Sequence, residues 1–184
     1  QSEALVMPAN PNTMFQSAVT LHQNGNVIEA LKYYLQLIDH FPKDPYLLFM
    51  LGTAELQIGN STEATKRFDQ YLQLQPYDPD GYVNRGTAFQ NLGELNKALA
   101  DFNRAIQLNS RIPNAYFNQG NVLIALKRYN EAIASFDNAL NLQSNLFQAH
   151  NNKGHALQLL ERYDEALTCF NHALAIYPHF IDAL

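Results

Sequence analysis

The sequence predicts an all-α solenoid, in which helix-turn-helix units stack on one another along the chain. The first observation is that one pattern returns every 34 residues, in residues 84–106, 118–140 and 152–174. The second is that, in this register, one position always holds alanine and another always an aromatic residue. The third is that the apolar positions are spaced as on the faces of two helices. A repeat of this period indicates stacked helical pairs rather than a closed globule.

Extending the register in both directions gives five units, and positions 1 to 34 are numbered within each unit. The units span residues 11–44, 45–78, 79–112, 113–146 and 147–180. Position 8 holds a small residue: Ala18, Gly52, Gly86, Gly120 and Gly154. Position 20 holds Ala30, Ala64, Ala98, Ala132 and Ala166. Position 24 holds Tyr34, Phe68, Phe102, Phe136 and Phe170.

Each unit is predicted to contain a first helix, a tight turn, a second helix and another turn. Positions 4, 7, 8 and 11 share one face of the first helix, and positions 17, 20, 21, 24, 27 and 28 share one face of the second. Prolines such as Pro45 open a unit, because proline is tolerated in a first helical turn. Glycines such as Gly25 suit the left-handed end of a first helix. Lys127 and Glu161 stand at that turn position in the last two units.

The small residues have a packing reason. Glycine or alanine at position 8 and alanine at position 20 remove side-chain bulk where the two helices of a unit cross. The aromatic ring at position 24 then fills the gap toward the next unit. One helical pair cannot bury its apolar face alone, so stacking supplies the missing cover.

This motif resembles the tetratricopeptide repeat (TPR) family over residues 11–180, and units 3 to 5 fit it best. The resemblance implies a right-handed superhelix whose concave groove is lined by the first helices. Unit 1 departs most, with Ser17, Ala18 and Leu37 where the pattern prefers leucine, glycine and alanine, so we expect it to pack somewhat irregularly. Units 3 to 5 are also similar to the TPR arrays of bacterial O-GlcNAc-transferase-like proteins.

Composition excludes several functional classes. The 184 residues are 47% hydrophobic, with 12 Lys and Arg against 17 Asp and Glu, a formal charge of −5. Without a basic stripe, no nucleic-acid partner is expected. No apolar run approaches the roughly 20 residues of a membrane span. The single Cys169 neither requires nor excludes an oxidising compartment. A cytoplasmic location is slightly favoured, and a periplasmic one stays open because a removed signal peptide would leave no trace.

No residues show a recognisable catalytic, metal or cofactor arrangement. His150 and His155 are five residues apart, which places them on different helix faces, unlike the i, i+4 pair of a zinc helix. Carboxylates such as Glu131 fall near second-helix N-termini, where they favour the helix dipole. We therefore expect no catalytic residue, no metal and no cofactor.

The resemblance implies that positions such as 2, 5, 9 and 12 project into the groove, where a peptide or protein partner would bind. The large aromatics Phe15, Phe49 and Phe117 at position 5 are the best anchor candidates, and packing against a neighbouring first helix is the alternative. Amide and hydroxyl side chains can bond an extended peptide backbone without fixing its sequence. The other groove candidates are Thr53, Asn84, Thr87, Asn118, Asn121, Ile124, Asn151, Asn152 and His155.

Two functions of different classes follow. The leading one is a protein-interaction scaffold that binds a partner in its groove. The alternative is the substrate-recognition region of a larger bacterial glycosyltransferase of the O-GlcNAc transferase type, favoured by an asparagine column at position 6: Asn84, Asn118 and Asn152. In such transferases, an asparagine ladder grips the substrate main chain.

The two ends of the array carry a separate expectation. Residues 1–10 form an N-terminal segment, and residues 181–184 read as the start of a further helix. Without a neighbour, Leu167, Phe170 and Leu174 of unit 5 would be exposed. We therefore expect the native chain to continue, or homo-oligomers to form through the exposed terminal faces.

Overall fold

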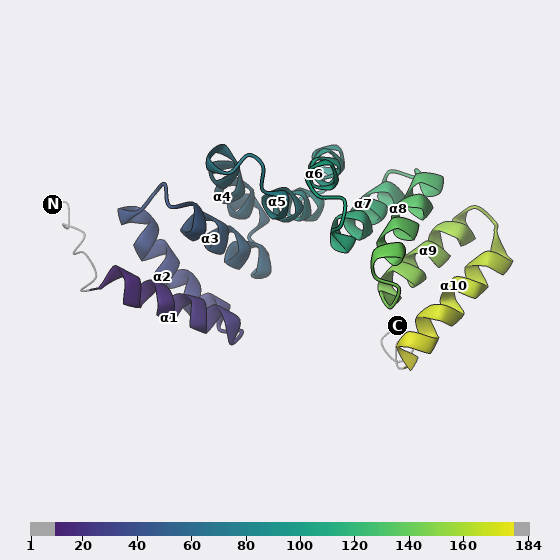
Figure 1. Ribbon diagram of the computed structural model, residues 1–184, viewed down its shortest axis with the longest axis horizontal. Coiled ribbons are helices and arrows are strands. Elements are labelled where there is room, and N and C mark those ends of the chain that lie inside the picture. The colour runs from purple at the N-terminus through teal and green to yellow at the C-terminus, as the bar shows by residue number, and fades with distance from the viewer. Residues whose placement is uncertain (1–9, 179–184) are drawn as a thin grey trace. The chain divides into compact units, whose positions relative to one another are not determined.

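A computed structural model describes residues 10–178 of the chain. It contains ten helices and, over those residues, no strand (Figure 1). The first helices of the repeats are α1 (Pro11–Gln23), α3 (Pro45–Gln57), α5 (Pro79–Asn91), α7 (Pro113–Ala125) and α9 (Phe147–Leu159). The second helices are α2 (Val27–His40), α4 (Ser61–Leu74), α6 (Leu95–Leu108), α8 (Tyr129–Leu142) and α10 (Tyr163–Ile176). The predicted all-α repeat architecture is confirmed.

Helix boundaries follow the period of the sequence. Each first helix has 13 residues and each second helix 14, and both kinds begin at intervals of 34 residues. A proline occupies the first turn of α1, α3, α5 and α7. Most of the expected segment 1–10 and all of the further helix expected at 181–184 lie outside the described residues. Within residues 10–178, no helix combines the length and apolar character needed to cross a membrane.

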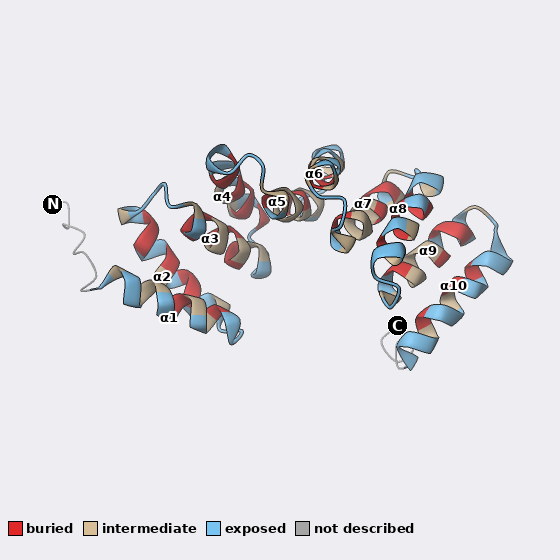
Figure 2. Ribbon diagram, viewed as in Figure 1, coloured by how far each residue is buried: buried red, intermediate tan, exposed pale blue. Residues whose placement is uncertain are grey.

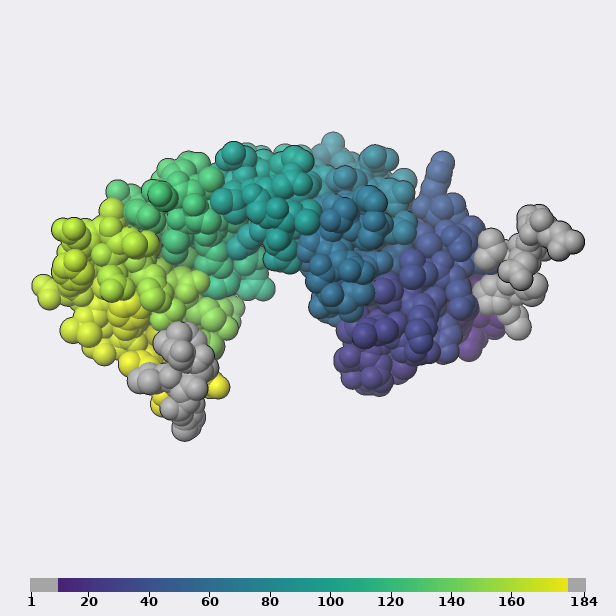
Figure 3. Space-filling model, turned by 180° about the vertical axis from the view of Figure 1, so that it is seen from behind, coloured from purple at the N-terminus to yellow at the C-terminus, as the bar shows by residue number. Residues whose placement is uncertain are grey.

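The chain divides into two compact units, Gln1–Leu92 and Gly93–Leu184. The first contains α1 to α5 and the second α6 to α10. Within each unit, every helix packs against the next along the chain, and alternate first helices also touch: α3 with α5, and α7 with α9. In the space-filling view, the colours of each unit accordingly follow chain order without interruption (Figure 3). Each unit is therefore a stack of consecutive helices.

The core of each unit is built around the aromatic ring at position 24. The rings of Tyr34, Phe68 and Phe136 have no exposed surface, and the buried stripes of the helices face one another (Figure 2). A Cβ atom added to Gly120 would lie 2.6 Å from Cε1 of Phe136. No ordinary side chain fits there, because real contacts of a Cβ atom are longer. The small residue at position 8 therefore sets the close approach of the two helices.

The turn inside each repeat ends the first helix with a left-handed residue. Gly25, Gly59 and Gly93 have φ of 82°, 87° and 74°. Lys127 and Glu161 adopt the same conformation without being glycine, at 61° and 60°. The amide of the following residue bonds back to a first-helix carbonyl, as from Arg128 N–H to Leu123 O at 2.8 Å. This is the Schellman arrangement, which satisfies carbonyls at a helix end.

Polar side chains join successive repeats at one fixed pair of positions, 25 of one repeat and 7 of the next. Arg85 Nη1 lies 2.7 Å from Asp69 Oδ1 in the first unit of the structure. In the second, Gln119 Nε2 donates to Asn103 Oδ1 at 2.6 Å, and Lys153 Nζ lies 2.5 Å from Asp137 Oδ1. These pairs are half-exposed, so each contributes little to stability by itself.

The helices of the first repeat are as regular as those of the others, although this repeat departs most from the sequence pattern. Its helices have the standard lengths, and Ala18, Ala30 and Tyr34 are fully buried. It differs by a buried histidine: His22 Nε2 lies 2.8 Å from Gln57 Oε1, and its Nδ1 lies 3.4 Å from the Tyr34 hydroxyl. A neutral imidazole that donates from Nε2 and accepts at Nδ1 satisfies both partners.

We predict that Lys127→Gly raises the stability of the chain. A left-handed non-glycine residue costs about 1–2 kcal/mol, and the extra chain entropy of glycine cancels part of the gain. The net increase in the free energy of unfolding is about 0.5–1 kcal/mol, measured by urea denaturation. The matched control is Ala134→Gly, at an exposed position in the middle of α8, which should cost about 1 kcal/mol. Equal losses for both variants would contradict the assignment of strain to Lys127.

Candidate functional site

All twelve candidate partner-binding residues lie on first helices of the repeats. In the first unit, Phe15 lies on α1, Phe49 and Thr53 on α3, and Asn84 and Thr87 on α5. In the second unit, α7 carries Phe117, Asn118, Asn121 and Ile124, and α9 carries Asn151, Asn152 and His155.

The aromatic candidates of the first unit rest on buried rings of the second helices. The Phe15 ring is half-buried, with its centroid 6.0 Å from that of Tyr34 and 5.3 Å from that of Tyr46. Phe49 is also half-buried, with its centroid 5.9 Å from Phe68 and 5.1 Å from Tyr71. Each ring therefore has one face on the core of its own repeat and part of its surface accessible to solvent. Packing thus fixes the orientation of both rings.

Phe117 repeats this arrangement in the second unit. Its ring is half-buried, and its centroid lies 6.0 Å from that of Phe136, the fully buried aromatic of the same repeat. Ile124, two turns further along α7, packs against the core of its own repeat and that of the following repeat and is only partly accessible. Ile124 therefore acts mainly in packing.

The hydroxyl groups of Thr53 and Thr87 already donate hydrogen bonds within the protein. Thr53 Oγ1 donates to Phe49 O at 2.8 Å, and Thr87 Oγ1 donates to Val83 O at 2.9 Å, both within their own helices. The Thr53 oxygen keeps a lone pair for a further donor. Thr53 can therefore accept from a bound peptide, and neither threonine has a hydroxyl proton to offer it.

The amides of the second unit form a small network across two repeats. Asn152 Nδ2 on α9 donates to Asn121 Oδ1 on α7 at 2.8 Å, and Asn151 Nδ2 donates to Asn152 Oδ1 at 3.3 Å. All three side chains are half-buried. Asn152, the last member of the position 6 column, is thus tied to a neighbouring repeat. The network holds amide groups in fixed places on this surface.

The two histidines of α9 have different surroundings. His155 is exposed, and its ring meets the Phe170 ring edge-on at 5.3 Å. His150 is half-buried, its Nε2 lies 3.1 Å from Ser144 O, and burial lowers its pKa. Among residues 10–178, no three histidine, cysteine or carboxylate side chains gather closely enough to hold a metal ion.

Carboxylates at the second-helix N-termini form ion pairs at the surface. Nε and Nη2 of Arg128 each donate to a carboxylate oxygen of Glu131 at 2.7 Å, and Arg162 does the same to Glu165. The bond from Arg128 holds the pKa of Glu131 below its usual value. A carboxylate held ionised by a fixed arginine is a poor general acid.

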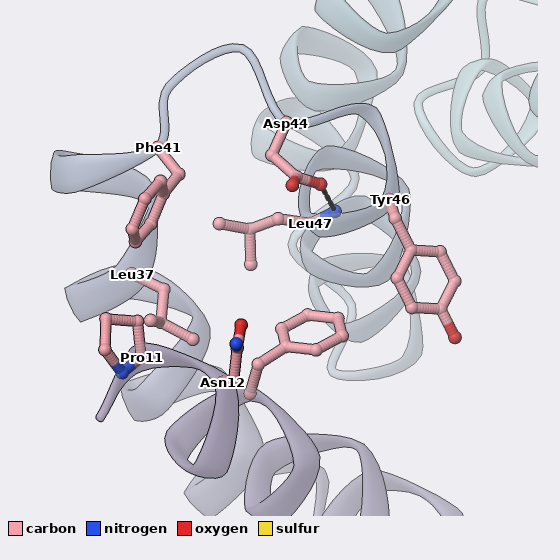
Figure 4. A pocket seen from close by; sticks show the side chains of 8 residues that line it. Pro11, Asn12, Leu37, Phe41, Asp44, Tyr46 and Leu47 are labelled. Atoms are coloured by element: carbon pink, nitrogen blue, oxygen red, sulfur yellow. Dashed lines mark hydrogen bonds between the residues drawn. The ribbon is translucent and has the colours of Figure 1, made fainter.

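A cavity of about 150 Å³ opens between α1, α2 and the start of α3 in the first unit (Figure 4). Phe15, Leu37 and Leu47 form its apolar lining. Phe41 and Tyr46 stand at its sides (Figure 4). Its polar groups are Asn12 and Asp44. Asp44 is the N-cap of α3, and its Oδ1 accepts from the Leu47 amide at 2.8 Å.

An equivalent but more open recess, of about 330 Å³, recurs 34 residues later between α3, α4 and α5. Its lining includes Phe49, Tyr71 and Asp78, at the positions that Phe15, Leu37 and Asp44 hold in the first cavity. Here the Tyr71 hydroxyl donates to Asp78 Oδ2. Burial and this bond raise the pKa of Tyr71, and burial beside Asp78 raises the pKa of Asp80.

Sequence reasoning includes Phe15 but misses the cavity beside it. The available signal is Leu37, which stands where the repeat pattern prefers alanine. By itself that departure predicts irregular packing rather than a binding surface. The repeat pattern also gives no role to Arg85, which pairs with Asp69 and lies 5.5 Å from the centroid of the Tyr82 ring.

Family models described as tetratricopeptide repeat match residues 16–79, 79–111 and 111–177. No curated protein matches the sequence. Together the three family matches extend over most of the described residues.

Several solved structures share the fold. A MamA chain of Desulfovibrio magneticus RS-1 superposes with a TM-score of 0.84 at 18% identity, over 95% of this chain and 99% of that one. A thermophilic TPR protein of Thermus thermophilus gives 0.74 at 23% identity, over 94% of both chains. YrrB, described as a TPR protein with an unusual peptide-binding site, gives 0.75 at 21% identity, over 94% of this chain and 89% of that one. At these identities the likeness concerns the fold alone.

Proposed function

The chain belongs to the tetratricopeptide repeat family, and on that premise we propose that it is a non-catalytic scaffold that binds a peptide or protein partner. In each unit of the structure, the proposed binding surface is the part of the first helices that carries half-buried aromatic rings. The observation that supports this most is the shared setting of Phe15, Phe49 and Phe117. Each ring rests on the buried aromatic of its own repeat and keeps a solvent-accessible part.

Rings held in this way suit partner binding for an energetic reason. A ring that is already fixed by packing loses little conformational entropy when a partner covers it. Aromatic residues are also common among the few positions that supply most of the binding free energy at an interface.

The polar groups around the rings complement a peptide main chain. Amides such as Asn121 and Asn152 can both donate and accept, and the threonine oxygens accept. YrrB, a protein of the same fold, is described as having a peptide-binding site, which agrees with a peptide-binding role for this chain. Binding through main-chain groups favours a partner with an extended segment.

The alternative is the recognition region of a larger O-GlcNAc-type glycosyltransferase. It is favoured by the position 6 asparagines, of which Asn152 is half-buried and held by Asn121. The coding sequence beyond Leu184 discriminates between the two functions, because a following catalytic α/β domain would support the alternative.

We predict that Phe117→Ala weakens partner binding more than it weakens the fold. Truncation of an anchoring aromatic typically costs about 2–4 kcal/mol of affinity. The loss of stability is smaller than that of Phe136→Ala, about 3–5 kcal/mol, because Phe136 is fully buried and Phe117 is not. Thermal unfolding measures the fold, and pulldown with quantitative mass spectrometry followed by affinity measurement on the captured protein measures binding.

The matched control is Tyr77→Ala, which removes an aromatic ring that is 76% exposed and lies in the turn between α4 and α5. It should change neither property. If Phe117→Ala lowers the melting temperature as much as Phe136→Ala does, Phe117 is a core residue and its assignment to the binding surface fails.

We further propose that two copies of the chain associate through the outer face of α10. Tyr163 and Leu167 are 61% and 60% exposed, whereas Ile133, which holds the position of Leu167 one repeat earlier, is 9% exposed. Phe170 and Leu174 on the same face are half-buried. A two-fold contact would place this apolar face against its equal in a second copy.

We predict that Leu167→Glu abolishes this association. A charge at the centre of the apolar contact would be buried without a partner. Light scattering over a concentration series should show dimers for the unaltered chain and monomers for the variant. The control, Leu159→Glu, changes a leucine that is 54% exposed at the end of α9 and should leave the dimer intact. A chain that stays monomeric at every concentration would refute the contact.

A further inference from the structure

We propose that the cavity between α1, α2 and α3 is a subsite for one tyrosine side chain of a bound peptide. The proposal rests on the scaffold function above and adds a specificity to it. It concerns only the first unit of the structure, which contains all the lining residues.

The size and lining of the cavity fit one aromatic ring. Its volume of about 150 Å³ matches that of apolar protein cavities that take up benzene. Leu37 and Leu47 present hydrocarbon to its interior (Figure 4), and Phe15 is a further apolar lining residue. Phe41 and Tyr46, which are 38% and 56% exposed, flank the opening. A ring can therefore enter from solvent and be covered on several sides.

The Asp44 carboxylate of the cavity has one oxygen that is free to accept a hydrogen bond. Asp44 uses Oδ1 to cap α3, through the Leu47 amide at 2.8 Å. Over residues 10–178, its second oxygen accepts no hydrogen bond. A carboxylate oxygen beside an apolar cavity favours a ligand that is mostly apolar and carries one donor. A phenol has both properties.

We call the place where α1, α2 and α3 meet the first joint, and the place where α3, α4 and α5 meet the second joint. The second joint already shows a carboxylate bonded to a phenol. Asp78 holds the position of Asp44, caps α5 through the Asp80 amide, and accepts the Tyr71 hydroxyl on its other oxygen. Tyr71 holds the position of Leu37. At the second joint the chain therefore supplies the phenol itself, and the recess of about 330 Å³ opens beside Tyr71.

A glycine makes room for that internal tyrosine. A Cβ atom on Gly81 would lie 2.8 Å from Cε1 of Tyr71. In the first joint, Leu47 holds the position of Gly81 and Leu37 that of Tyr71. A leucine side chain has no hydrogen-bond donor, so neither leucine can bond to the free oxygen of Asp44. A ring-sized space with a free acceptor remains, and a partner's tyrosine can supply what Tyr71 supplies one repeat later.

Two small probes test the subsite without a protein partner. The full chain is titrated with N-acetyl-tyrosinamide and with N-acetyl-phenylalaninamide, and amide NMR shifts are followed. We expect both to shift the signals of Phe15, Tyr46 and Leu47. The tyrosine probe should bind roughly tenfold more tightly, because a hydrogen bond to a charged group adds about that factor. Equal affinities, or shifts that spare these residues, would overturn the proposal.

A conservative variant isolates the carboxylate. In Asp44→Asn the remaining oxygen still caps α3, since asparagine is an equally good N-cap, but the second acceptor is gone. The preference for the tyrosine probe should disappear while binding of the phenylalanine probe stays within about twofold. A preference that survives this change would show that Asp44 does not receive the hydroxyl.

A double variant occupies the free oxygen from within. Leu37→Tyr with Leu47→Gly copies the Tyr71 and Gly81 pair into the first joint, so the preference for the tyrosine probe should disappear. If the variant does not fold, Asp44→Asn still decides the proposal. The probes bind without a protein partner, so a failure of the subsite can be distinguished from a failure of the proposed scaffold function. A chain that captures a protein through Phe117 but binds neither probe remains a scaffold and lacks this subsite.

Discussion

The contact between a second-helix aromatic ring and the small residue it covers on the first helix supports the rest of the structure. Phe136 lies so close to Gly120, and Phe68 to Gly52, that a Cβ atom at either glycine would meet the ring at 3.0 Å or less. This contact brings the two helices of a repeat together and buries the ring completely. The same rings then hold Phe49 and Phe117 at 5.9 and 6.0 Å, on the surface proposed to bind a partner.

Much of this architecture could be predicted from the sequence, because the contact leaves a signature at two fixed positions. A glycine or alanine and an aromatic residue 16 positions later predict the paired helices, and Gly25 predicts the left-handed turn between them. The polar pairs between repeats could not be predicted. Their chemistry changes from Asp69 with Arg85 to Asn103 with Gln119, so only their closeness in space reveals one function.

The sequence predicts which helices carry the candidate site, but not the distances between its side chains or the cavity beside them. A periodic pattern places Phe15 on a first helix, but the distance to Tyr34 depends on how the two helices cross. The cavity beside Phe15 depends on two leucines that replace a tyrosine and a glycine of the following joint. Each exchange looks like an ordinary variation of the repeat, and their combination leaves a carboxylate oxygen unused beside an apolar cavity.

A double-mutant cycle between Gly120 and Phe136 tests the central contact most directly. Gly120→Ala overpacks the contact with the Phe136 ring and should cost about 1–3 kcal/mol of the free energy of unfolding. In a Phe136→Leu background the smaller side chain leaves room for the added methyl group, so the cost of Gly120→Ala should fall by at least about 1 kcal/mol. Costs that add to within about 0.5 kcal/mol would contradict the account, because they would show that glycine and ring do not set each other's position.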